Sequence, residues 1–270
     1  MIMLEYIGYF CAVVIGMVLG LTGTGGAILT VPVLVYLMGF NPVTAAAYSL
    51  FIVGTTSTFG TFQNFRKGTV EIRTGFIYAF PSLIGVFLSR RFIVPALPDV
   101  LFTISDFTVT KEIFVMVLFA IIMFMSGISM LKPKKKDDDT EDETKESSGS
   151  NRIWMFAKVF FAGIVVGLVG AGGGFLFIPL LIYVAKLPMK KAVATSLLII
   201  AINSLIGFTG DLFTATINWI FLFTFTIFSV MGIFTGIFLS RYFNDAKLKK
   251  GFGIFVLTMA AFIMIRELIV

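Results

Sequence analysis

The stretch Gly20-Leu21-Thr22-Gly23-Thr24-Gly25-Gly26 recurs, with two substitutions, as Gly167-Leu168-Val169-Gly170-Ala171-Gly172-Gly173. Each copy lies between apolar runs, and each is followed at the same distance by a proline, Pro32 or Pro179. Clustered glycines interrupt a helix and leave backbone amides unshielded by side chains, as at helix N-termini that bind anions. We therefore predict that the two glycine breaks form the centre of the functional site.

The composition is that of a polytopic membrane protein. Of 270 residues, 58% are hydrophobic and 13% charged, and the mean hydropathy is +1.00. These values exclude an ordinary soluble domain, so the lipid bilayer is the expected surrounding. The net charge of +6 then reports membrane topology, and no nucleic-acid partner is expected. With no histidine and one cysteine, Cys11, we predict no catalytic residue, no metal site and no cofactor.

Apolar segments recur along the whole chain, five in each half. They cover 4–20, 27–38, 43–62, 74–89, 112–131, 153–169, 174–185, 192–209, 217–239 and 251–269. The second segment of each half would form a helix only about 18 Å long, which is short for a bilayer core of about 30 Å. The first and second segments are therefore expected to form a hairpin with its glycine turn inside the bilayer. Whether the short segment spans the membrane or re-enters it stays open.

A charged stretch divides the halves. Residues 132–152 contain runs of Lys, Asp and Glu followed by Ser147-Ser148-Gly149-Ser150, so they cannot bury apolar surface. We predict a first transmembrane repeat over 1–131, a cytoplasmic linker over 132–152 and a second transmembrane repeat over 153–270.

The halves are internal repeats. A shift of 147 residues, which places Gly20 on Gly167, also aligns Pro32 with Pro179 and a series of Ala, Ser and Gly residues beyond them. Further on, 85–92 matches 236–243 with a shift of 151, which predicts four extra residues in the second half.

The positive-inside rule predicts that the repeats are inverted. Sixteen Lys and Arg residues then lie on the cytoplasmic side, in 63–73, 132–152, 186–191 and 240–250, against three outside: Arg90, Arg91 and Lys111. Treating each glycine-broken pair as one span gives nine and ten instead. The predicted fold is thus an all-α polytopic membrane protein of two inverted repeats, each with a glycine-broken first helix pair. Both termini are expected outside, and this design is common among secondary transporters.

The candidate substrate-binding residues are backbone amides at the breaks and hydroxyl or amide side chains on the segments that follow them. Neutral donors of this kind bind oxyanions without a buried charge. The predicted set is Gly23, Thr24, Gly25, Gly26, Ser49, Thr56, Ser57, Gly170, Gly172, Gly173, Gly174, Ser196, Asn203 and Ser204. Each glycine could instead serve close helix packing, and each hydroxyl could bond its own helix.

Ionisable residues are almost absent from the deep segments. Asp211 is expected in an external turn, and no buried Arg–Asp pair is expected. Cation binding through membrane carboxylates is therefore disfavoured.

The doubled Gly-Leu-x-Gly-x-Gly-Gly motif, its downstream proline and two Ala-x-x-x-Ser-Leu runs resemble those of the sulfite exporter TauE/SafE family of membrane transporters. The resemblance covers about 16–91 and 163–243. It implies movement of sulfite, sulfonates or related sulfur- or carboxylate-bearing anions, typically outward across the prokaryotic plasma membrane. One departure is Ala27, where the second copy has Gly174, so an asymmetric site is expected.

The leading hypothesis is a secondary transporter that exports a small anion across the cell membrane. The alternatives are an anion channel of the same architecture, an importer of a sulfur-containing anion, and a membrane enzyme or scaffold. The sequence leaves the substrate, the coupling ion and a homo-oligomeric state open.

Overall fold

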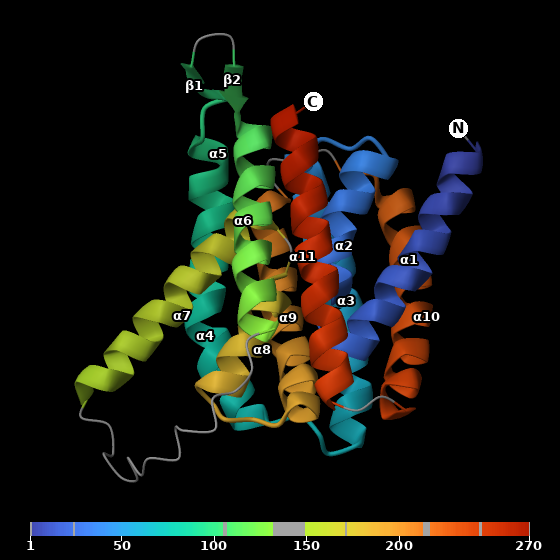
Figure 1. Ribbon diagram of the computed structural model, residues 1–270, viewed down its shortest axis with the longest axis vertical. Helices are drawn as coiled ribbons and strands as arrows, with labels where there is room; N and C mark the ends of the chain where they lie inside the picture. The colour runs from blue at the N-terminus through green and yellow to red at the C-terminus, as the bar shows by residue number, and fades with distance from the viewer. Residues whose placement is uncertain are drawn as a thin grey trace.

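The computed structural model describes residues 2–23, 25–104, 107–131, 149–170, 172–212, 217–242 and 245–269. It is a helical bundle, in which all ten predicted apolar segments are helices (Figure 1). The first half comprises α1 (Ile2–Thr22), α2 (Gly25–Pro32), the π-helix η1 (Val33–Leu37), α3 (Pro42–Arg66), α4 (Ile72–Leu88), the π-helix η2 (Ser89–Ile93), α5 (Val94–Ala96) and α6 (Lys111–Leu131). The second comprises α7 (Gly149–Val169), α8 (Gly174–Tyr183), α9 (Met189–Asp211), α10 (Trp219–Leu239), the 3₁₀-helix η3 (Ser240–Tyr242) and α11 (Asp245–Ile269).

Four helical stretches in the described part of the chain are long and apolar enough to cross a bilayer. They are Ile72–Ala96, Lys111–Ser129, Met189–Asp211 and Trp219–Tyr242. Shorter apolar helices cover Ile7–Thr22, Gly26–Leu37 and Met155–Val169. This composition makes the chain a multi-pass membrane protein.

The predicted linker 132–152 lies mostly outside the described residues. Its last residues, from Gly149, already belong to α7. The structure also departs from the all-α expectation. A β-hairpin of β1 (Val100–Ile104) and β2 (Phe107–Thr110) projects beyond the bundle (Figure 1). Its β-branched and aromatic residues favour extended structure.

Both glycine breaks turn the chain back on itself. In the first half, Gly26 packs against Ile15, and the end of η1 returns to the start of α1, where Met38 lies against Gly8. In the second half, Gly173 packs against Val166 of α7. In the first half, α1 and α2 therefore pack on each other as the predicted hairpin. In the second half, α7 and α8 are not among the helix pairs in close contact in the described part of the chain, so the glycine break turns the chain without packing these two helices along their lengths.

The two halves pack on each other through related contacts. A Cβ on Gly16 of α1 would strike the backbone of Ser229 in α10, and one on Gly163 of α7 would strike that of Ser82 in α4. Each residue of the second contact is related to one of the first by the shift of 147. Small residues here allow backbone-to-backbone approach.

The same contacts correct the predicted shift of 151. Gly85 packs against Phe160 and Ile164 of α7, and the matching contact belongs to Gly232, which packs against Val13 and Met17 of α1. The shift is thus still 147 at this point, and the four extra residues are not there. Gly232 and Gly236 lie one helical turn apart, so aligning the two halves by residue identity alone paired Gly85 with Gly236 instead of Gly232.

The equivalent helices α3 and α9 cross in opposite directions at the centre of the molecule. Gly54 lies against Leu205, Gly60 against Leu197, and Gly207 against Leu50. Successive positions along α3 therefore contact positions progressively earlier in α9, so the two helices are antiparallel. The pair α6 and α11 is also antiparallel, since Gly127 lies against Leu257 and Gly253 against Leu131.

The bundle has two distinct ends. The upper end carries the β-hairpin, the start of α1 and the end of α11, and the lower end carries the end of α6 and the start of α7 (Figure 1). At the lower end, Lys191 Nζ lies 2.6 Å from Glu71 Oε1, which ties the start of α9 to the turn before α4.

Candidate functional site

The crossing of α3 and α9 is lined with buried polar side chains. Pro42 at the first turn and the Asn41 cap start α3, so that its hydroxyl-rich middle reaches the centre of the bundle. The predicted residues on these helices are all 0% exposed, namely Ser49, Thr56, Ser57, Ser196, Asn203 and Ser204.

Two equivalent hydrogen bonds extend this polar layer to the neighbouring helices. Thr56 Oγ1 donates to Ser229 Oγ of α10 at 3.1 Å. Asn203 Nδ2 donates to Ser82 Oγ of α4 at 2.8 Å. The shift of 147 places Thr56 on Asn203 and Ser82 on Ser229, so the two bonds between the halves occupy equivalent positions.

Several of these buried atoms have no partner among the described residues. They are Ser49 Oγ, Ser57 Oγ, Ser204 Oγ and Asn203 Oδ1. Leaving a buried polar group unpaired costs about 1–3 kcal/mol, and native proteins rarely tolerate a cluster of such groups without a ligand or water. The three hydroxyls are donors available to an anion.

The first glycine break lies against the start of α9. Gly23 adopts a left-handed φ of +75°, and its carbonyl lies 3.4 Å from Ser196 Oγ, which also donates to the Val193 carbonyl at 2.8 Å. Gly25 begins α2, and Gly26 packs on α1 beside Ile15. Thr24 lies outside the described residues.

The second glycine break reaches the crossing itself. Gly172 has a φ of +65°, and a Cβ there would lie 2.9 Å from Ser204 Oγ and 3.1 Å from Val53 of α3. Gly170 lies against Ala46, three residues before Ser49. Gly173 caps α8 with a φ of +71°, and Gly174 begins that helix.

The structure thus joins much of the predicted site and separates the rest. It brings Gly23 to Ser196 and Gly172 to Ser204, and α2 touches α8. Gly26 and Gly173 pack on their own preceding helices, α1 and α7, which is a structural role.

The expectation of no buried Arg–Asp pair is wrong. Arg90 Nε donates to Asp211 Oδ2 at 2.7 Å, and the two residues are 1% and 4% exposed. Arg90 was predicted to be an external loop residue, and Asp211 was predicted in an external turn. Instead η2 continues the helix of α4 past Leu88, and α9 runs on to Asp211. Two opposite charges, 121 positions apart, gave no local signal in the sequence.

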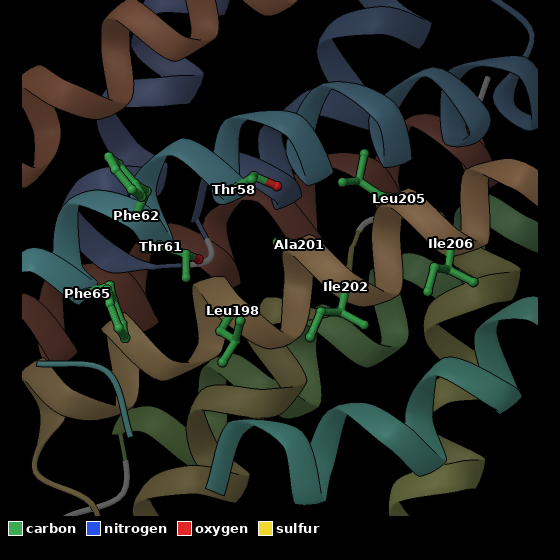
Figure 2. A pocket seen from close by; sticks show the side chains of 9 residues that line it. All are labelled: Thr58, Thr61, Phe62, Phe65, Leu198, Ala201, Ile202, Leu205 and Ile206. Atoms are coloured by element: carbon green, nitrogen blue, oxygen red, sulfur yellow. The ribbon is translucent and has the colours of Figure 1, made fainter. Parts of the chain in front are cut away.

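A groove of about 460 Å³ opens between α3 and α9. Figure 2 shows Thr58, Thr61, Phe62 and Phe65 on one wall, and Leu198, Ala201, Ile202, Leu205 and Ile206 on the other. Apart from the two threonines the walls are hydrocarbon, so the groove does not suit an anion. Among the described residues, no cluster of His, Cys, Asp and Glu could hold a metal ion.

Comparison with known proteins agrees with the membrane character of this site. The model of the family "Sulfite exporter TauE/SafE" matches residues 9–263. A probable membrane transporter protein of Xylella fastidiosa (strain 9a5c) is 27% identical over 258 residues, which cover 94% of this chain and 92% of the relative. The probable membrane transporter protein YunE of Bacillus subtilis is 28% identical, over 77% of this chain and 80% of its own. No solved structure matches significantly. A family match over nearly the whole sequence shows that the chain belongs to the sulfite exporter TauE/SafE family of membrane transporters.

Proposed function

We propose that the protein is a secondary transporter that exports a small anion, such as sulfite, an organosulfonate or a related sulfur- or carboxylate-bearing anion, across the cell membrane. The observation that carries the proposal is the cluster of unpartnered buried hydroxyls, Ser57 and Ser204, at the crossing that Gly172 approaches. Neutral O–H donors and exposed backbone amides can replace the hydration shell of an anion.

Inverted repeats are the second part of the proposal. The antiparallel crossing of the equivalent helices α3 and α9 supports an inverted relation between the halves. The paired bonds of Thr56 and Asn203 support a two-fold axis at the same level. Two such halves can rock about a shared site and open it to each side in turn.

The lower end is proposed to face the cytoplasm, with the first repeat in 1–131, the linker in 132–152 and the second repeat in 153–270. Figure 1 places the α3–α4 and α8–α9 turns at that end. The supporting observation is that six basic residues lie in these turns or in the adjoining helix ends, namely Arg66, Lys67, Arg73, Lys186, Lys190 and Lys191.

The test is transport by purified protein in liposomes. Sulfite, thiosulfate, sulfoacetate, taurine and acetate are offered with and without a pH gradient. We expect saturable flux of at least one of the anions, with taurine, which has no net charge, as the internal comparison. Flux of none of them, under any gradient, would overturn the proposal.

The same vesicles separate the carrier from an anion channel or an importer. A carrier exchanges internal for external substrate, so unlabelled anion on one side accelerates the exit of labelled anion from the other. A channel gives flux that rises linearly with the driving force. The direction follows from vesicles of known orientation under an inside-negative potential.

A further inference from the structure

The buried ion pair of Arg90 and Asp211 joins three elements at the upper end. Arg90 belongs to η2 of the first half, and Asp211 ends α9 of the second half. Arg90 Nη1 also lies 3.5 Å from the carbonyl of Gly167 in α7, where the second glycine motif begins. Gly210 leaves room for the arginine, since a Cβ there would lie 3.1 Å from that of Arg90.

The guanidinium of Arg90 has an N–H donor, Nη2, without a hydrogen-bond partner among the described residues. Its Nε donates to Oδ2 of Asp211, and Nη2 lies 2.7 Å from the same oxygen but outside hydrogen-bond geometry. Arginine has more N–H groups than one carboxylate oxygen can accept. A bound oxyanion could take the donors that Asp211 leaves unused.

Ser89 supplies a second donor beside the first. Its side chain is 0% exposed, and Oγ has no partner among the described residues. It lies against the same backbone as Arg90, because a Cβ on Gly167 would be 3.0 Å from Ser89 Oγ. A buried cation and an unpaired hydroxyl at one point of the backbone make a site for an oxyanion.

Packing alone does not require this pair. The shift of 147 places Ile237 at the position of Arg90 and Asn64 at that of Asp211. Ile237 is 2% exposed, and Asn64 Nδ2 donates to the Gly60 carbonyl of its own helix, so the equivalent positions of the other half carry no charge. A buried ion pair is often no more stable than apolar residues of similar volume, because both charges lose their water.

We propose that Arg90 and Ser89 form an anion-binding site at the upper end of the transport path, and that Asp211 occupies the guanidinium when no substrate is there. The incoming anion, a small oxyanion of the sulfite, sulfonate or carboxylate class, displaces the carboxylate and binds the fork of N–H groups. This inference rests on the proposed transport of anions. It adds the charged residue that selects for them.

The test compares the two partners of the pair. Removing the competitor in Asp211→Asn is expected to lower the KM for anion about tenfold, whereas Arg90→Gln raises it about tenfold and Arg90→Lys less, as a charged hydrogen bond predicts. Ser89→Ala raises KM a few-fold. Arg73→Gln, at an exposed position of the lower end, is the control and leaves KM unchanged.

A purely structural pair gives a different result. Asp211→Asn and Arg90→Gln would then lower the thermal midpoint alike and lower transport alike, and the double variant would restore both. That outcome overturns the inference and leaves the transport function intact.

A second readout does not depend on transport. Sodium sulfite and sodium methanesulfonate, against sodium chloride of equal ionic strength, are expected to raise the thermal midpoint of the detergent-solubilised protein. The rise should be larger in Asp211→Asn and absent in Arg90→Gln. If this holds while no anion crosses the membrane, the binding site stands and the transport proposal fails. If the rise is the same in all variants, the site is refuted.

Discussion

At the scale of single residues, Gly172 of the second break combines a left-handed conformation with close approach to the proposed site. Gly172 has a φ of +65° and lies beside Ser204 Oγ, whereas Gly68, in the turn after α3, has a φ of +67° and nothing within reach of a Cβ. An alanine at position 68 therefore tests backbone strain alone, and an alanine at position 172 tests strain together with a methyl group beside Ser204.

We predict that Gly172→Ala and Gly68→Ala each lose about 1–2 kcal/mol of stability, because alanine is strained in the left-handed region. Only Gly172→Ala should also abolish transport, since its methyl group enters the crossing. Thermal unfolding in detergent and liposome flux measure the two effects. Equal flux in both variants would remove Gly172 from the site.

The unpartnered hydroxyls give a prediction of opposite sign for stability and for function. Ser57→Ala and Ser204→Ala remove buried groups that have no partner in the empty protein, so the thermal midpoint should stay or rise. Transport should fall about tenfold for each lost hydrogen bond to a charged substrate.

Ser82→Ala is the matched control, since Ser82 Oγ accepts from Asn203 and donates within α4. It should lose about 1 kcal/mol of stability. If Ser57→Ala and Ser204→Ala are destabilised as strongly as Ser82→Ala, their hydroxyls are structural.

The sequence predicted the neutral residues that lie at the crossing of α3 and α9, and it missed the buried charges at the upper end. Ser196, Asn203 and their equivalents follow a repeat that can be read from one line of letters. Arg90 and Asp211 have no such repeat, because Ile237 and Asn64 stand in their places. Their pairing is visible only once the two halves are packed together.

At the scale of elements, the packing of α1 on α10 and of α4 on α7 depends on glycines that allow the backbones to touch. We predict that Gly163→Ala forces α7 away from Ser82 and costs about 1–3 kcal/mol, as overpacking does elsewhere. Gly16→Ala, its equivalent on α1, should cost a similar amount.

Gly251→Ala in α11 is the control for this pair, because a Cβ there meets nothing within 4 Å. Alanine should raise its helix propensity slightly. A thermal shift assay in detergent compares the three variants, and an unchanged midpoint for Gly163→Ala would contradict the close approach.

The presence of the helices could be predicted from the sequence, but the alignment of α10 with its equivalent α4 could not. Long apolar runs predicted all ten helices because hydropathy reports burial in lipid or protein. The repeated glycines of α10 allowed two alignments one turn apart, and only the contacts of Gly85 and Gly232 distinguish them. The β-hairpin was missed because it is short and borders an apolar helix.

At the scale of the whole molecule, the proposed inverted arrangement predicts that equivalent positions lie on opposite sides of the membrane. The shift of 147 relates Phe65, the last residue but one of α3, to Leu212, which directly follows α9. Their side chains are 55% and 40% exposed. In a Cys11→Ser background, we predict that an impermeant maleimide labels Leu212→Cys from outside intact cells. Phe65→Cys should label only after the cells are opened.

Two flanking positions provide the controls. Asp99→Cys, just before β1, should label with Leu212→Cys, and Lys67→Cys, just after α3, should label with Phe65→Cys. Labelling of positions 65 and 212 from the same side would mean parallel repeats and would remove the basis for rocking halves.

The Arg90–Asp211 pair also has a consequence for energetics that no symmetric molecule would share. A carrier built from identical halves has equal free energies in its two end states. Here Arg90 and Asp211 form a buried ion pair, and their equivalents Ile237 and Asn64 are uncharged. Under the proposed rocking of the two halves, the empty protein favours one resting state, and we expect unequal apparent affinities from the two faces of a vesicle, because each face meets only the fraction of molecules that is competent to bind there.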